Sequence, residues 1–143
     1  LTQSKAVELS RKKDIFIICG HYEGVDQRVI NKIVDEEISI GDYVLTGGEL
    51  PALVLIDSVA RMCDGVLSSP ECFEDESHFN GLLEYPQYTR PEIWENEAVP
   101  SVLLSGHHKN IADWRHQKSL EITKERRPDL YEKYTKKLLT DKK

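Results

Sequence analysis

The amino-acid sequence predicts an α/β domain, then a linker, then a small helical module. Two apolar stretches rich in β-branched residues end at glycines and alternate with apolar residues at helical spacing, which is typical of βα units. An acidic, turn-rich stretch with few aliphatic residues follows. Beyond it, apolar residues return at helical spacing. We therefore expect an α/β domain over 1–67, a flexible linker over 68–81 and a helical domain over 82–143.

The expected α/β domain contains three helices and two strands. Polar and apolar residues in its first part favour a short helix, and the apolar run that follows reads as a buried strand. The helix over 51–62 is apolar nearly all round, so it should be buried against its own subunit or a partner. In order, we expect a helix over 2–12, a strand over 14–20, a helix after Gly24 with Val25, Val29 and Ile33 inward, a strand over 36–45, a break at Gly47-Gly48, and the helix over 51–62.

The helical module contains three expected elements. Residues 102–104 form a short apolar segment before a Ser105-Gly106 turn. Asn110 is a candidate N-cap for the next helix. Pro128 then opens a last helix, because proline is well tolerated at the first helical position.

Composition excludes several classes of protein. The 143 residues are 39% hydrophobic and 31% charged, so disorder, collagen and coiled coil are poor interpretations. The longest apolar runs, 15–19 and 52–56, are far shorter than the roughly 20 residues that cross a bilayer. The layout of the first residues differs from a secretory signal. We therefore expect no membrane partner and a cytoplasmic location.

Metal and disulfide sites are not indicated. Cys19, Cys63 and Cys72 are an odd number without CxxC spacing, which favours reduced structural thiols. The His107-His108 pair has no third ligand at a convincing spacing, so we expect no metal.

The charge changes sign along the chain. Residues 1–83 carry 7 basic and 15 acidic side chains, whereas 107–143 carry 11 basic and 6 acidic ones. A basic end on an acidic body is compatible with a module that grips phosphate, and equally with a solvated helical face.

Two glycine-bearing loops, 20–24 and 41–51, follow the two expected strands. Ligands of open α/β sheets collect beyond the carboxyl ends of strands, where glycine lets backbone approach closely. Neither loop is a GxGxxG or a Walker loop, which disfavours a Rossmann dinucleotide site and a P-loop. A single glycine in such a loop is more often a plain turn residue, and the pairing of the two loops is what indicates a site.

Charged residues around the linker are further candidates. Arg61 is the only basic residue between Lys32 and Arg90, and an arginine that ends an apolar helix needs a carboxylate or a ligand. Asp75 and Glu76 lie in the linker, where carboxylates are usually solvated surface.

Basic residues beside an aromatic side chain suit RNA. Arg115 and Lys118 lie in such a stretch with Trp114, which is either a core residue or a stacking platform. We expect Arg115 and Lys118 to contact the RNA backbone and this module to read no base.

Residues 19–26, 35–51, 81–91 and 102–106 closely resemble the bacterial tRNA (guanine-N1)-methyltransferases of the TrmD type. The resemblance implies a SPOUT-type parallel sheet with a trefoil knot, a homodimer, and methyl transfer from S-adenosylmethionine to N1 of guanosine at position 37 of tRNA. Members of the family have an N-terminal segment before the position of Leu1 that contributes to the knot, so we expect the knot to be incomplete in this chain. Alternatives are another SPOUT RNA methyltransferase, or a non-catalytic dimerising and RNA-binding piece of such an enzyme.

The resemblance also implies roles for individual residues. The family's linker aspartate, proposed to take the proton from the guanine, falls on Glu76, with Asp75 beside it as the alternative. The family's arginine, which steadies charge on the guanine oxygen, falls on Arg61. The cofactor-binding positions fall on Gly20, Tyr22, Glu23, Ile40, Gly41, Asp42, Tyr43, Val44, Leu45, Gly47, Gly48 and Pro51.

Overall fold

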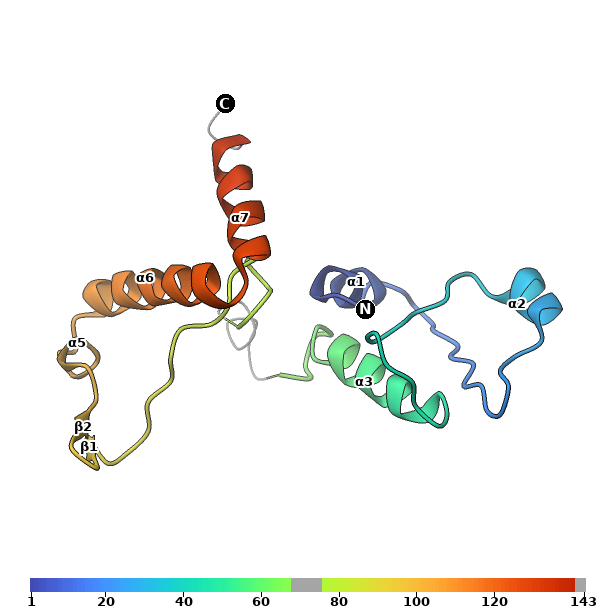
Figure 1. Ribbon diagram of the computed structural model, residues 1–143, viewed down its shortest axis with the longest axis horizontal. Coiled ribbons are helices and arrows are strands. Elements are labelled where there is room, and N and C mark those ends of the chain that lie inside the picture. Colours follow the sequence, from blue (N-terminus) through green and yellow to red (C-terminus); the bar gives the residue numbers. More distant parts are fainter. Residues whose placement is uncertain (68–75, 141–143) are drawn as a thin grey trace. The chain divides into compact units, whose positions relative to one another are not determined.

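The computed structural model describes residues 1–67 and 76–140. The chain divides into two compact units, Leu1–Cys72 and Phe73–Lys143, which we call the N-terminal and the C-terminal unit. The N-terminal unit contains α1 (Gln3–Leu9), α2 (Gln27–Ile33) and α3 (Glu49–Ala60) (Figure 1). The C-terminal unit contains β1 (Ile93–Trp94), β2 (Glu97–Ala98), α5 (Ser101–Leu104), α6 (His108–Arg126) and α7 (Pro128–Thr140).

The core of the N-terminal unit lies between α1 and α3, which run side by side (Figure 1). Ala6 and Leu9 of α1 pack against Leu55 and Val59 of α3. The side chain of Thr2 caps α1 by accepting a hydrogen bond from the Lys5 amide at 3.3 Å. The helices expected over 2–12 and 51–62 are therefore confirmed, with somewhat different ends.

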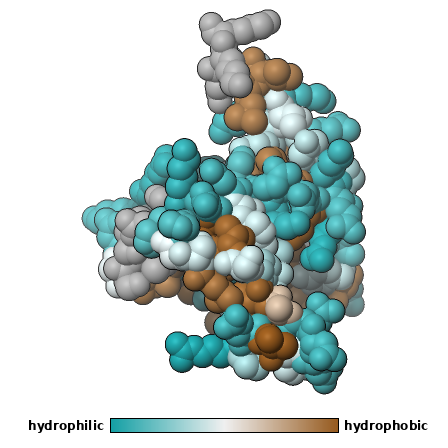
Figure 2. All heavy atoms as spheres, turned by 90° about the vertical axis from the view of Figure 1, so that its left-hand side faces the viewer, coloured by the Kyte–Doolittle hydropathy of each residue, from teal (hydrophilic) through white to brown (hydrophobic). Residues whose placement is uncertain are grey.

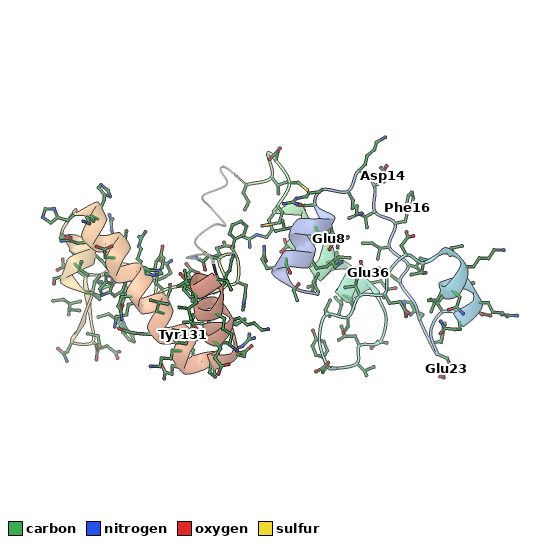
Figure 3. All side chains as sticks on the ribbon, turned by 90° about the horizontal axis from the view of Figure 1, so that it is seen from above. Glu8, Asp14, Phe16, Glu23, Glu36 and Tyr131 are labelled. Atoms are coloured by element: carbon green, nitrogen blue, oxygen red, sulfur yellow. The ribbon has the colours of Figure 1, made fainter. Side chains whose placement is uncertain are left out.

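An ion-pair cluster ties α1 to the segment after α2. Lys5 Nζ lies 2.8 Å from Glu8 and 3.0 Å from Glu36, and both labelled carboxylates can be found in Figure 3. Hydrogen bonds to Glu8 and Glu36 raise the pKa of Lys5. Exposed ion pairs of this kind contribute little stability, so the apolar contact of α1 with α3 holds this unit.

The strands expected over 14–20 and 36–45 are wrong for the chain as described. Within 1–67 no residue is in a strand, and Phe16 is 95% exposed and points away from the ribbon (Figure 3). A strand forms only where a neighbouring strand takes up its backbone hydrogen bonds. Apolar β-branched residues indicate a tendency to be buried, but they do not say which segment supplies the partner. The parallel sheet and the knot implied by the resemblance stay predictions.

The helix expected over 51–62 is only partly buried within this chain, and its burial against a partner stays a prediction. Leu55 and Val59 are buried, but Leu53 is 60% exposed, and Leu50 and Ile56 are exposed too. Because α1 covers only one side of α3, the remaining apolar residues of the helix have no cover among the residues described.

The helix expected after Gly24 is present as α2, and its N-cap Asp26 accepts from the Arg28 amide at 2.8 Å. Its expected inward stripe is not buried, since Val29 and Ile33 are both exposed. The sequence predicted this helix correctly. The described part of the unit contains no surface that covers its apolar stripe.

The C-terminal unit is built on α6, against which α5 and α7 pack. Leu82 and Thr123 are its most deeply buried side chains. Thr123 Oγ1 donates to the Ser119 carbonyl at 2.6 Å and accepts from the Leu83 amide at 2.8 Å. This hydroxyl therefore fixes the segment before residue 85 to the C-terminal end of α6.

The sequence predicted the start of one helix in this unit correctly and the start of another wrongly. Helix α6 begins at His108 with His107 as N-cap, so the prediction of Asn110 as N-cap is wrong. Gly106 has a φ of 69°, which ends the turn after α5 at that residue. The next helix can therefore start at His108, before Asn110. Helix α7 begins at Pro128 as expected, and it turns away from the line of α6 (Figure 1).

The strands β1 and β2 form an antiparallel hairpin that sequence reasoning missed. Its two turn residues, Glu95 and Asn96, have φ values of 47° and 69°, as the first and second turn positions of a type I′ hairpin require. Glu-Asn is not the Asn-Gly signal that usually reveals such a turn. This is the only sheet in the described residues.

Candidate functional site

The structure brings the two glycine-bearing loops together, as expected. The Gly48 amide donates to the Gly20 carbonyl at 3.1 Å. A Cβ atom at Gly48 would lie 2.8 Å from Cys19 Cα and 3.1 Å from the Gly20 nitrogen. Only glycine permits this approach, so Gly48 is required for the contact between the loops.

A side-chain pair forms a second link between the loops. His21 Nε2 and a carboxylate oxygen of Glu49 are in hydrogen-bonding contact, and both side chains are about half exposed. The Glu49 amide and His21 together lower the pKa of the Glu49 carboxyl, with the amide as the larger cause. Sequence reasoning missed this pair, although Glu49 follows Gly47-Gly48 directly and His21 follows Gly20.

The remaining cofactor candidates lie on the surface near this contact. Ile40, Gly47 and Pro51 are half-buried. The Tyr43 ring lies against Gly41, where a Cβ would come within 2.5 Å of the ring. The exposed candidates are Tyr22, Glu23, Gly41, Asp42, Tyr43, Val44 and Leu45.

Backbone groups beside the contact are free to bind a ligand. No described residue forms a hydrogen bond with the amide or carbonyl groups of residues 42–46. The exposed rings and aliphatic edges of Tyr43 and Leu45 flank these groups. A flat heterocycle is commonly recognised by backbone hydrogen bonds together with apolar edges, so the residues present fit the adenosine part of S-adenosylmethionine.

The candidate catalytic residues fall in different units. Arg61 is the C-cap of α3 in the N-terminal unit, and its amide donates to the Asp57 carbonyl at 3.2 Å. Glu76 is half-buried in the C-terminal unit, where its carbonyl accepts from the Phe79 amide at 3.4 Å. Asp75 lies outside the described residues.

The two candidate RNA-binding residues differ in their surroundings. Lys118 pairs with Glu121 at 2.6 Å on the same helix. The Arg115 guanidinium lies over the Tyr85 ring, 4.7 Å from its centroid. The half-buried Trp114 ring lies 6.3 Å from the Tyr88 ring. Arg115 therefore lies against an aromatic residue, Tyr85, that the sequence analysis had not connected with it.

A cavity of about 520 Å³ lies beside Arg115 in the C-terminal unit. Sequence reasoning missed it, because its walls come from the extended residues 85–90 and from two helices further along the chain. Two aromatic residues and two prolines close together in residues 85–91 were the available signal.

Other kinds of site find no support in the described ranges. No three His, Cys, Asp or Glu side chains there are grouped so that they could hold a metal ion. Cys19 and Cys63 are free thiols, and Cys72 lies outside these ranges. No helix within them has the length and apolar character needed to span a membrane.

Comparison with known proteins bears on the same residues. The family model described as "tRNA (Guanine-1)-methyltransferase TrmD" matches residues 1–133. Proteins named tRNA (guanine-N(1)-)-methyltransferase are similar to this chain: 63% identity with that of Ruminiclostridium cellulolyticum over 97% of the chain, 60% with that of Clostridioides difficile over 94%, and 57% with that of Lachnospira eligens over 95%. The chain spans 58 to 60% of the length of these relatives. Since the family model covers more than nine-tenths of its residues, the chain belongs to the TrmD family of tRNA (guanine-N1)-methyltransferases.

Proposed function

We propose that the protein containing this chain transfers a methyl group from S-adenosylmethionine to N1 of guanosine at position 37 of tRNA. The observation that carries the proposal is the contact of Gly48 with Gly20, which brings together the two loops on which the cofactor positions implied by the resemblance fall. The free backbone groups of residues 42–46 lie directly beside this contact.

The N-terminal unit supplies the proposed cofactor site. S-adenosylmethionine, when bound, supplies an electrophilic methyl group on a sulfonium. The backbone of residues 42–46 would hold the adenine by hydrogen bonds, and the exposed side chains of Tyr43 and Leu45 would provide apolar contacts to it. The link between His21 and Glu49 keeps the two loops in register. These residues orient the cofactor and exclude water from it.

The proposed reaction also needs a base, because N1 of guanine carries a proton that must leave when the methyl group arrives. Glu76 takes this proton, with Asp75 as the alternative base, and the carboxylate becomes a carboxylic acid. Arg61 stabilises the negative charge that the guanine oxygen gains as the proton leaves. The new bond between N1 and the methyl group replaces the bond between the sulfonium sulfur and the methyl group, which leaves a neutral thioether. The proton lost from N1 neutralises the carboxylate, so atoms and charge balance.

We further propose that the protein has the SPOUT fold with its trefoil knot. In that fold, the exposed apolar residues of 14–20 and 36–45 pair as strands of a parallel sheet. The Tyr43 and Leu45 edges then form one side of a closed slot. Such a protein acts on tRNA in the cytoplasm, which fits the location expected from the sequence.

The exposed face of α3 supports a homodimer. Leu50, Leu53 and Ile56 form an apolar surface that the described residues leave uncovered, and a second copy of the protein covers it. Leu53→Glu should shift sedimentation from dimer to monomer at micromolar concentration. Val66→Glu, which changes an exposed apolar residue outside α3, is the matched control. Equal sedimentation of wild type and Leu53→Glu contradicts this interface.

Two measurements on the full-length protein test the proposed activity. Calorimetry should show binding of S-adenosylmethionine. A methyl-transfer assay should show product on a tRNA transcript with guanosine at position 37 and none on a transcript with adenosine there. Binding of tRNA without binding of the cofactor supports a non-catalytic RNA-binding role instead. Methylation of ribosomal RNA or of a ribose supports another SPOUT methyltransferase.

A further inference from the structure

The cavity in the C-terminal unit has polar and apolar walls. Tyr88 and Gln87 from the extended segment form one side, while Leu103 of α5 and Ile111 and Arg115 of α6 form the other. A second hollow of about 380 Å³ shares Ile111 and Arg115 with it. Arg115 therefore borders two neighbouring hollows.

Arg115 has hydrogen-bonding capacity that the chain does not use. Its guanidinium lies 4.7 Å from the Tyr85 ring centroid, which fixes the plane of the group. Its Nε is buried, and no described residue accepts a hydrogen bond from it. A guanidinium has five N–H donors in a flat fork, and a buried N–H without an acceptor is destabilising. Because Arg115 also lines both hollows, its charge there suits a ligand that brings oxygen acceptors.

Tyr88 offers a flat surface for stacking. Its side chain is 46% exposed, and the Trp114 ring lies against it with a centroid distance of 6.3 Å. Trp114 thus supports the ring from within the unit, while Tyr88 itself faces the cavity. An exposed, supported ring is the usual platform for an unstacked nucleobase.

The charge around the two hollows favours an anion. Arg90 and Arg115 line the larger hollow together with one acidic residue, Glu92. His108 and His116 line the smaller one, which has no acidic residue in its wall. Teal, hydrophilic side chains surround smaller brown areas on the face shown in Figure 2. A volume of about 520 Å³ is within the usual range for small-ligand pockets.

We propose that this pocket binds one unpaired nucleotide of RNA, with the base stacked on Tyr88 and the phosphate at Arg115. The inference rests on the proposed function, since it takes tRNA as the substrate. It departs from the expectation that the helical module contacts only the RNA backbone. The pocket recognises a single-stranded loop, because a base within a duplex cannot reach the Tyr88 ring.

Binding of a labelled anticodon stem-loop RNA to the full-length protein tests the pocket, with a fully paired RNA of equal length as reference. Tyr88→Leu should weaken stem-loop binding about tenfold, because stacking on one aromatic ring is lost. The salt dependence should stay unchanged and the affinity for the paired RNA should be equal to that of wild type. Tyr88→Phe keeps the ring and should restore stem-loop binding, which separates loss of stacking from loss of folding.

Matched variants separate the pocket from general charge and aromatic effects. Trp94→Leu removes an exposed aromatic residue that does not line either hollow, and it should leave stem-loop affinity unchanged. Arg115→Ala should reduce the slope of log affinity against log salt by about one phosphate contact. Lys118→Ala removes a charge that pairs with Glu121, and it should change the slope less.

Abasic substitutions along the loop then identify the bound nucleotide. At the position whose base stacks on Tyr88, removal of the base should weaken wild-type binding about tenfold and should have no effect in Tyr88→Leu. If all abasic effects add to that of Tyr88→Leu, or if Tyr88→Leu weakens stem-loop and duplex equally, the pocket does not bind a base. Wild-type protein that binds the stem-loop but transfers no methyl group contradicts the proposed function and leaves the pocket in place.

Discussion

The two units of the chain bury different kinds of side chain. The N-terminal unit buries four apolar side chains between α1 and α3 and leaves an apolar face of α3 and the run around Phe16 exposed. The C-terminal unit buries Leu82 together with Ser119 and Thr123, and the Thr123 hydroxyl is hydrogen-bonded to the Ser119 carbonyl and the Leu83 amide. A buried hydroxyl can be hydrogen-bonded within its own unit, whereas exposed apolar side chains are stabilised only when another surface covers them. The exposed face of α3 is therefore the part of the N-terminal unit that the proposed homodimer would cover.

The largest expected effect concerns the carboxylate proposed to serve both units. Glu76→Gln in the full-length protein should lower the single-turnover rate of methyl transfer by about 10²- to 10⁴-fold, because the side chain can no longer accept the guanine proton. Affinity for S-adenosylmethionine should stay nearly unchanged, since an interaction needed only in the transition state affects the rate. Rapid-quench kinetics and calorimetry measure the two quantities.

Asp75→Asn is the matched variant for this test. Glu76 has one methylene more than the aspartate usual in the family, so the neighbouring residue is the direct competitor for the role. If Asp75→Asn slows the reaction steeply and Glu76→Gln does not, Asp75 is the base.

The second prediction concerns the contact between the loops in the N-terminal unit. Gly48→Ala places a methyl group 2.8 Å from Cys19 Cα, and the backbone has to move to relieve it. Overpacking of this kind costs about 1–3 kcal/mol, so affinity for S-adenosylmethionine should fall about tenfold. Val66→Ala is the control, because it changes an exposed residue of the same unit outside both loops. Equal losses from both variants in calorimetry contradict a special role for the Gly48 contact.

The third prediction concerns the buried hydroxyl of the C-terminal unit. Thr123→Val keeps the shape but leaves the Leu83 amide without its acceptor, so the free energy of unfolding should fall by about 1–2 kcal/mol. Thr135→Val is the control, since the Thr135 hydroxyl only donates to carbonyls of its own helix. Urea unfolding measures both. Similar losses for the two variants are incompatible with Thr123 as the anchor of this segment.

The smallest expected effect is on acid stability at the start of α7. A hydrogen bond from Arg127 lowers the pKa of Asp129 to about 2 from its ordinary value near 3.8. Because the folded pKa is the lower one, the ionised carboxylate stabilises α7 above about pH 4, and this contribution is lost as the pH falls toward 2. Circular dichroism between pH 5 and 2 should show a shallower helix loss for Asp129→Asn and for Arg127→Gln than for wild type. A wild-type profile in Arg127→Gln contradicts the assignment.

Helices were the part of the fold that the sequence predicted best. The apolar spacing of α3 and Pro128 at the start of α7 are local signals, and both helices form where expected. The strand over 14–20 depends on a partner strand, which the local pattern does not specify. Burial of α3 likewise depends on what covers Leu53, and helical spacing does not contain that information.

The sequence likewise predicted one part of the candidate site and missed another. The meeting of the two glycine-bearing loops was predicted, because close backbone approach requires glycine at Gly48. The contact of His21 with Glu49 and the cavity at Tyr88 and Arg115 were missed. Both depend on side chains from distant segments, and their distances follow from packing rather than from spacing along the chain.

Glu76, the base of the proposed reaction, lies at the start of a segment that is hydrogen-bonded to the C-terminal unit. Its neighbour Ser77 accepts from the Glu84 amide at 2.9 Å, and the adjacent Leu83 is bound to Thr123, so Glu76 begins a segment anchored to α6. Arg61 ends α3 in the other unit. The proposed reaction therefore takes its base and its guanidinium from different units of the chain.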